Sequence, residues 1–127
     1  MADGFSTTFT NSLLNLLNGT SAANYSTVYV SIHTAAPGTA GTTSVSVGST
    51  TRASATFGTA ASGSIALSST PQWTNGGTNE TITDISVWSA ASSGTFLFSA
   101  ALSTSKAWSS GDTLQLSSLS VSLPTAS

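Results

Sequence analysis

The chain has 127 residues, of which 39% are hydrophobic and only 5% are charged, and its formal net charge is -2. Two cationic side chains, Arg52 and Lys106, cannot follow a phosphate backbone, so nucleic acid is excluded as a partner. Without cysteine the chain forms neither disulfides nor thiolate metal cages, and no apolar stretch approaches the roughly 18 residues of a membrane span.

The length fits a single domain over residues 1–127. The first residues contain no positively charged segment that leads into an apolar run, so no secretory leader is expected. We therefore expect synthesis in a cytoplasm and no association with a membrane.

The first predicted element is an amphipathic helix over residues 4–18. Asp3 or Ser6 can cap its start, and Gly19 is suited to end it. Its polar face is uncharged, so packing must hold the helix in place. Its apolar stripe is expected to cover a sheet or to lie against another subunit, and it consists of Phe5, Phe9, Leu13, Leu16 and Leu17.

Strands are predicted next. Residues 28–33 alternate apolar and polar side chains, which is typical of a half-buried strand, and residues 35–41 then form a turn around Pro37 and Gly38. Residues 42–51 are expected to be an exposed loop or a weak edge strand. Shorter strands are predicted at residues 52–57, 64–68 and 72–74.

Residues 81–102 predict a hairpin whose two arms carry bulky side chains on both faces. Such a hairpin is expected inside a sheet that is covered on both sides. Further short strands are predicted around residues 114–116 and 119–123. The fold class is therefore mainly β: an antiparallel β-sandwich or jelly-roll-like barrel over residues 27–123, preceded by one N-terminal α-helix.

Catalytic and metal sites have few candidate residues. His33 is the only histidine and no G-x-S-x-G elbow is present, so His33 is interpreted as a strand residue on a solvent or interface face. The four acidic residues have no metal-ligand spacing, and structural roles are favoured for them over a glycosidase pair. We expect no catalytic, metal or cofactor residue, and thus no enzyme and no cofactor.

The three tryptophans remain. Trp88 lies inside a predicted strand and is expected in the core. Trp73 and Trp108 lie beside turns, where core or subunit contacts are favoured and stacking on a sugar is the alternative. Together with the helix stripe, they give the candidate subunit or partner contacts: Phe5, Phe9, Leu13, Leu16, Tyr29, His33, Trp73 and Trp108.

Several stretches resemble a known family. Residues 28–38, VYVSIHTAAPG, are similar to the "LYVALHTADPG" pattern of small tailed-bacteriophage structural proteins, which include tail-fibre, minor tail and head-decoration proteins. Residues 51–57, TRASATF, resemble that family's "YARQAVTF". Residues 81–123 resemble its "ITHIGLWDAATGGTLL…GDTL…LTVSL" block, in which the aligned residues are Trp88, Gly94, Gly111, Asp112 and Leu123.

The resemblance implies a non-enzymatic component of a phage virion. The favoured role is a capsid decoration protein that forms a homo-oligomer, expected to be a trimer, and binds the major capsid protein or another virion protein. One alternative is a tail-fibre or tail-tip module that displays residues 35–51 toward a host surface. A second alternative, of another class, is a carbohydrate-binding module that uses Trp73 or Trp108.

Overall fold

A computed structural model describes residues 3–126. The N-terminal helix α1 spans Thr7–Leu14 and continues as a 3-10 turn, η1, over Asn15–Asn18. Ser6 caps its start by accepting a hydrogen bond from the Phe9 amide, and Gly19 ends it in a left-handed conformation at φ 85°. The helix begins three residues later than expected because residues 4–6 pair with a strand instead.

A four-stranded antiparallel sheet forms the centre of the molecule. Its strands are β1 (Val28–His33), β2 (Ala53–Ala55), β5 (Glu80–Trp88) and β6 (Phe96–Trp108), in the order β2-β1-β5-β6. The register places Val30 opposite Val87 and Ile32 opposite Ile85, so the large apolar side chains of β1 and β5 share one face. The predicted hairpin is present as β5 and β6.

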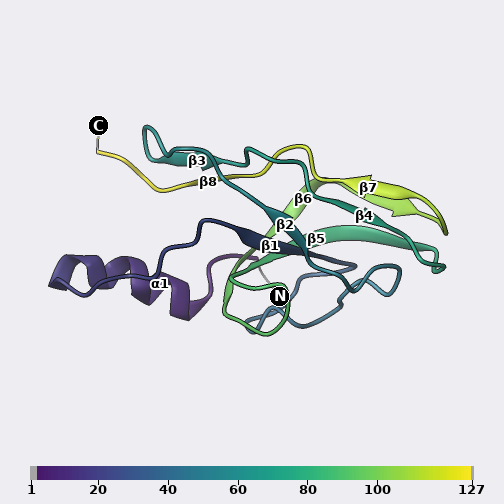
Figure 1. Ribbon diagram of the computed structural model, residues 1–127, viewed down its shortest axis with the longest axis horizontal. Helices are drawn as coiled ribbons and strands as arrows, with labels where there is room; N and C mark the ends of the chain where they lie inside the picture. Colours follow the sequence, from purple (N-terminus) through teal and green to yellow (C-terminus); the bar gives the residue numbers. More distant parts are fainter. Residues whose placement is uncertain (1–2, 127) are drawn as a thin grey trace.

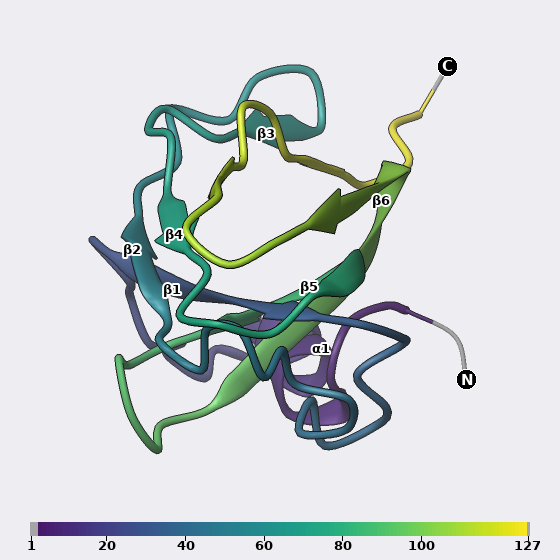
Figure 2. The same cartoon turned by 90° about the vertical axis from the view of Figure 1, so that its right-hand side faces the viewer.

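A long two-stranded ribbon covers this face of the sheet. It consists of β3 (Ser64–Ala66) paired with β8 (Ser120–Ser122), and of β4 (Gln72–Thr74) paired with β7 (Thr113–Gln115). Two further backbone hydrogen bonds join the ladders, from Leu67 to the Leu119 carbonyl and from Leu116 to the Pro71 carbonyl. Figures 1 and 2 show the ribbon lying over the sheet, and Figure 1 shows the helix projecting from one end.

The core lies between the sheet and the ribbon, around Val30, Ile32, Ile85 and Val87. The opposite face of the sheet is covered too, because residues 34–51 fold back under it and bury Ser31 and His33. The mainly β fold with one N-terminal helix and antiparallel sheets is confirmed. Among residues 3–126 no sheet closes into a barrel, so the arrangement is compatible with the sandwich and not with the barrel.

Strand β6 corrects one expectation about the hairpin. It lies at the edge of the sheet, and only its first part is covered, where Phe5 pairs with Phe98. Farther along, Asp84 pairs with Ala101 and Ile82 pairs with Lys106, so Thr83 alone stands opposite the four residues 102–105. This irregularity lifts β6 away from β5.

The loop of the hairpin, residues 89–95, is clamped by Arg52. The guanidinium donates hydrogen bonds to the carbonyls of Ala90 (2.9 Å) and Ser93 (2.7 Å) and lies 3.8 Å from the ring centroid of Trp88. The loop turns at Gly94, whose φ is 75°.

Gly94→Val is expected to lower the free energy of unfolding by about 1–3 kcal/mol. A side chain there would have to adopt a left-handed conformation, and its Cβ would lie 2.8 Å from both the Ala90 Cβ and the Ser89 Oγ. Urea denaturation followed by circular dichroism measures the loss. Gly4→Val is the matched control, because no atom lies within 4 Å of a Cβ at Gly4. An equal loss in both variants would contradict the role assigned to the turn.

Candidate functional site

The helix is anchored to the body at one end only. Phe5 and Phe9 meet edge to face at 5.6 Å between ring centroids, and each packs against Phe98 of β6, at 5.9 and 6.5 Å. Phe5 also continues the sheet, because it pairs with Phe98 through the backbone. This aromatic cluster fixes where α1 leaves the body.

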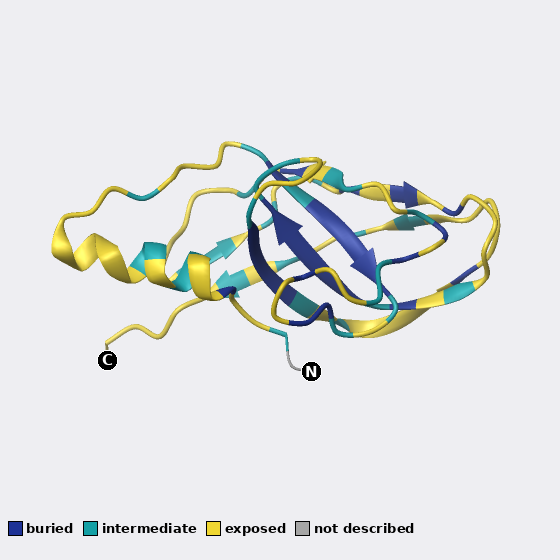
Figure 3. Ribbon diagram, turned by 90° about the horizontal axis from the view of Figure 1, so that it is seen from below, coloured by how far each residue is buried: buried dark blue, intermediate teal, exposed yellow. Residues whose placement is uncertain are grey.

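Beyond the cluster the apolar stripe of the helix is largely uncovered by the described part of the chain. No residue of α1 or η1 is buried, and Leu13 is half-buried. The exposed fraction is 60% for Leu14, 56% for Leu16 and 89% for Leu17. Figure 3 shows the largely exposed helix projecting past the buried strands of the sheet. Short uncharged helices depend on packing, so this stripe is a candidate contact surface.

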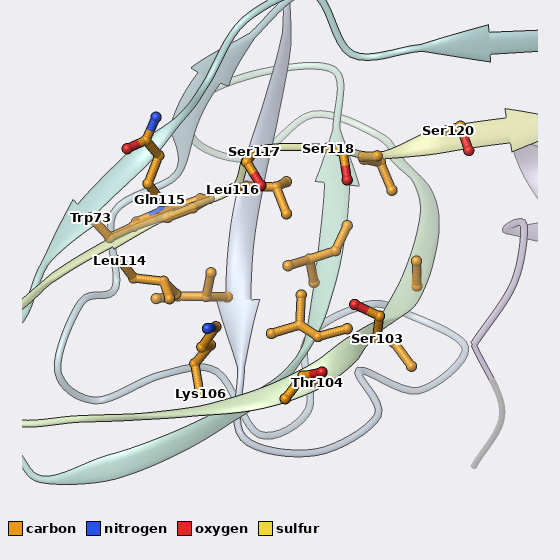
Figure 4. A pocket seen from close by; sticks show the side chains of 16 residues that line it. Trp73, Ser103, Thr104, Lys106, Leu114, Gln115, Leu116, Ser117, Ser118 and Ser120 are labelled. Carbon is orange, nitrogen blue, oxygen red and sulfur yellow. The ribbon is translucent and has the colours of Figure 1, made fainter.

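A groove opens between β6 and residues 114–120 of the ribbon. It encloses about 530 Å³, which is within the usual range for binding pockets. Its floor includes Ile32 and Ile85, and its walls carry half-buried leucines at positions 102, 114, 116 and 119. Figure 4 shows Ser117 and Ser118 on one wall facing Ser103 and Thr104 on the other.

A second hollow of about 260 Å³ extends this groove toward the helix. It is lined by Phe5, Phe98 and Val121, among others. Because both hollows are lined by Ala100 and Ser120, they form one continuous depression along β6, which we call the β6 groove. The sequence analysis missed it, since alternation at residues 114–123 predicts strands and does not say that one side of the sandwich stays open.

The eight predicted contact residues separate into two groups. Five of them lie at or near the surface, on the helix, just before it or on β1. They stay predicted contacts: Phe5, Phe9, Leu13, Leu16 and Tyr29. The other three are buried inside the chain: Trp73 is 3% exposed, Trp108 is 4% exposed and His33 is fully buried. Both tryptophan rings therefore lie in the core, which was one of the two favoured expectations, and neither ring offers a face to a sugar.

His33 therefore does not lie on a solvent or interface face, as its strand pattern suggested. Residues 34–51 cover it, and its Nδ1 lies 2.8 Å from the Thr43 carbonyl oxygen, to which it donates. Its Nε2 accepts a hydrogen bond from the Ser86 hydroxyl, 2.7 Å away, and the same hydroxyl oxygen accepts from the indole N–H of Trp88 at 2.8 Å. A serine–histidine pair is thus present, but both side chains are fully buried and a backbone carbonyl occupies the position of the third triad member.

Acid is expected to destabilise the fold through His33. Burial lowers its pKa from the ordinary 6.5, while the Thr43 carbonyl and the Asp84 charge oppose that shift. The unfolded chain then binds more protons below pH 6.5, so the stabilisation is complete above this pH and is lost as the pH falls toward the folded pKa.

Urea midpoints of the wild type and of His33→Gln at pH 7.5, 6.5 and 5.5 measure this effect. The wild type should lose more stability than the variant over this range. Asp84 acts on the pKa of His33 and is present in both proteins, so the difference between them reports His33 together with its interaction with Asp84. Parallel losses in the two proteins would contradict the assignment.

Glu80 fixes the loop that covers His33. Its carboxylate accepts hydrogen bonds from the Ser46 hydroxyl at 2.5 Å, the Gly48 amide at 2.7 Å and the Val47 amide at 3.2 Å. Burial alone would raise its pKa, but these hydrogen bonds outweigh burial and hold the pKa below the ordinary 4.5. The buried Trp108 indole N–H forms no hydrogen bond of good geometry, although it lies near enough to this carboxylate to favour its charge.

Within residues 3–126 no group of three or more metal-ligating side chains comes together. No helix in that part of the chain combines the length and apolarity needed to cross a membrane. The candidate site is a pair of surfaces: the apolar helix stripe, and the β6 groove, which has an apolar floor between walls rich in serine and threonine.

Comparison with known proteins identifies the family of the chain. Residues 4–124 match the family model described as Podophage GP4 fiber I protein gp80. The chain belongs to this family. No curated protein matches it.

Membership in the Podophage GP4 fiber I protein gp80 family makes the chain a structural protein of a tailed bacteriophage, and the resemblance seen in the sequence is confirmed at that level. The match covers both the helix and the β-sandwich. Both surfaces described above therefore lie inside the family's own region.

Proposed function

We propose that this chain is a structural subunit of a fibre on a tailed-phage particle and that it works by packing against neighbouring subunits. The observation that carries the proposal is the family match over residues 4–124, whose description names a fibre protein. The exposed leucines of the helix and the nearly uncharged surface support it, because both favour association through apolar burial.

The mechanism is mass action. A subunit that binds only the assembled structure stabilises it by its binding free energy at every site. Contacts made by the helix stripe depend little on salt, since ions screen charge pairs but not apolar burial. Such a subunit suits a particle that meets changing ionic strength outside its host.

Capsid decoration, the role expected from the sequence, is the alternative of the same class. The resemblance of residues 81–123 to a family that includes head-decoration proteins favours it, whereas the family description speaks for a fibre. A carbohydrate-binding role has no exposed tryptophan ring to use.

Immunogold labelling and quantitative mass spectrometry of purified virions test the proposal. A fibre subunit gives label confined to fibres and a low copy number relative to the major capsid protein. Label spread over the whole head, with a copy number close to that of the capsid protein, would replace the fibre by decoration. Absence of the chain from the virion would overturn both.

A further inference from the structure

The helix stripe and the β6 groove lie on opposite sides of the Phe5–Phe98 pairing. Residues 4–6 run antiparallel to β6: the Ser6 amide bonds the Leu97 carbonyl, and the Ser99 amide bonds the Gly4 carbonyl. The chain therefore enters α1 in the direction of Phe96, whereas the groove follows β6 in the other direction, toward Lys106. The helix of a given copy points away from that copy's own groove.

We propose that the β6 groove binds the helix Thr7–Asn18 of a second copy of this chain. Both surfaces are apolar at their centres: leucines project from the helix, and half-buried leucines line the groove. The helix has no charged residue, and the groove lining has a single one, Lys106 at one end. Docking the helix in the groove therefore buries no charged side chain of the helix.

The dimensions agree with this occupant. The helix, with its 3-10 turn, is about 20 Å long. The groove follows β6 from Phe98 to Lys106, which is at most about 26 Å for an extended strand. Pockets along the groove reach the buried floor of the sandwich at Ile32 and Ile85, so leucine side chains can enter it without opening the sheet.

A second copy explains more than a foreign protein does. Each copy carries one unpartnered stripe and one unpartnered groove, so each copy both gives and receives a helix. A different protein in the groove would leave the helix stripe of every copy exposed. Because the two surfaces differ, the contact is head-to-tail and repeats until a ring closes or a filament grows. This inference rests on the proposed function in one respect, namely that the contact joins successive fibre subunits.

Sedimentation velocity of the purified full-length chain over a concentration series tests the contact. The wild type should form species larger than a dimer as the concentration rises. Leu17→Glu on the stripe and Ser118→Glu at the mouth of the groove each place a charge in the interface, and each should weaken association at least about tenfold. Both positions are exposed and Leu17 is 89% exposed, so both variants should have the melting temperature that the wild type shows at concentrations where it is monomeric.

Two matched variants control for the added charge. Asn11→Glu lies on the exposed polar side of the helix, and Ser110→Glu lies in an exposed turn that does not line the groove. Both should associate like the wild type. If they weaken association as much as the interface variants do, net charge and not the contact governs assembly, and the proposal fails.

Mixing the two interface variants distinguishes head-to-tail contact from pairing of like surfaces. Leu17→Glu keeps an intact groove and Ser118→Glu keeps an intact helix, so an equimolar mixture should form a heterodimer and nothing larger. Helix-to-helix pairing predicts instead that Ser118→Glu assembles like the wild type. That result, a mixture that stays monomeric, or a wild type that stays monomeric at every concentration, would overturn the proposal.

The cysteine-free sequence allows a direct check of proximity. Leu17→Cys and Ser118→Cys proteins, mixed and oxidised, should yield the mixed disulfide as the main product, while Asn11→Cys with Ser118→Cys should not. Equal yields from both pairs would contradict the docking. Self-association can fail while the protein is still found in fibres, or succeed while it is absent from virions, so this inference and the proposed function fail separately.

Discussion

Trp73→Ala is expected to lower the free energy of unfolding by about 3–5 kcal/mol. The ring is 3% exposed on β4 and lies among the core residues, so its removal leaves a cavity that the neighbouring side chains cannot close. Its indole N–H also donates to the Thr51 carbonyl at 3.0 Å, and that acceptor loses its partner. Urea denaturation followed by circular dichroism measures the change.

Trp73→Phe separates the ring from the hydrogen bond. It keeps most of the apolar volume and removes the donor, so its loss should be only about 1–2 kcal/mol. If Trp73→Ala left the urea midpoint unchanged, the ring would have to lie at the surface, where it could stack on a sugar. Because the ring is buried, we expect Trp73→Ala to lower the stability of the fold before any effect on sugar binding could be measured.

The second large effect is expected at Glu80. Glu80→Ala removes the acceptor of three hydrogen bonds from residues 46–48 and should lower the free energy of unfolding by about 2–4 kcal/mol. The loop then loses the contact that holds it over His33, so backbone amides near Val45 should exchange with deuterium faster than in the wild type. Hydrogen exchange followed by mass spectrometry measures this.

Glu80→Gln is the control for charge. It retains one oxygen acceptor and should lose about half as much stability. Because the pKa of Glu80 is lowered in the folded protein, its stabilisation is present above pH 4.5 and is lost as the pH falls below it. The wild type should lose more stability than Glu80→Gln as the pH falls below 4.5. An identical acid profile in both proteins would exclude Glu80 as its source.

Local sequence patterns predicted where the helix and the main strands lie, but they did not predict what covers them. The spacing of Phe9 and Leu13, with Ser6 before and Gly19 after, was enough to place the helix, because capping and periodicity act within a few residues. Alternation likewise placed β1 and the β5–β6 hairpin. Bulky residues on both faces of β6 suggested an internal strand, but residues 4–6, distant in sequence, cover only its first part.

The candidate surfaces depended on information that no single stretch contains. His33 alternates correctly for a strand, yet whether its face meets solvent was decided by residues 34–51, whose Ser, Thr and Gly content predicts only a loop. The open side of the sandwich follows from the number of strands in the second layer. That number is a property of the topology, and alternation at residues 114–123 does not reveal it.

The two layers of the sandwich differ in stability, because the ribbon has fewer hydrogen-bonded partners than the sheet. Strands β4, β7 and β8 each have a hydrogen-bonded partner along one edge only, and β3 gains on its second edge only backbone bonds to Gly58 and Ala61. The ribbon leucines are half-buried, whereas β1 and β5 are bonded along both edges and are mostly buried. On heating, the β3–β8 end of the ribbon should fray before β1 and β5 do, while buried Trp73 holds β4 to the core. A subunit that arrives in such a frayed form could lock its ribbon only after a neighbour has settled beside it, which would make assembly and the completion of folding a single event.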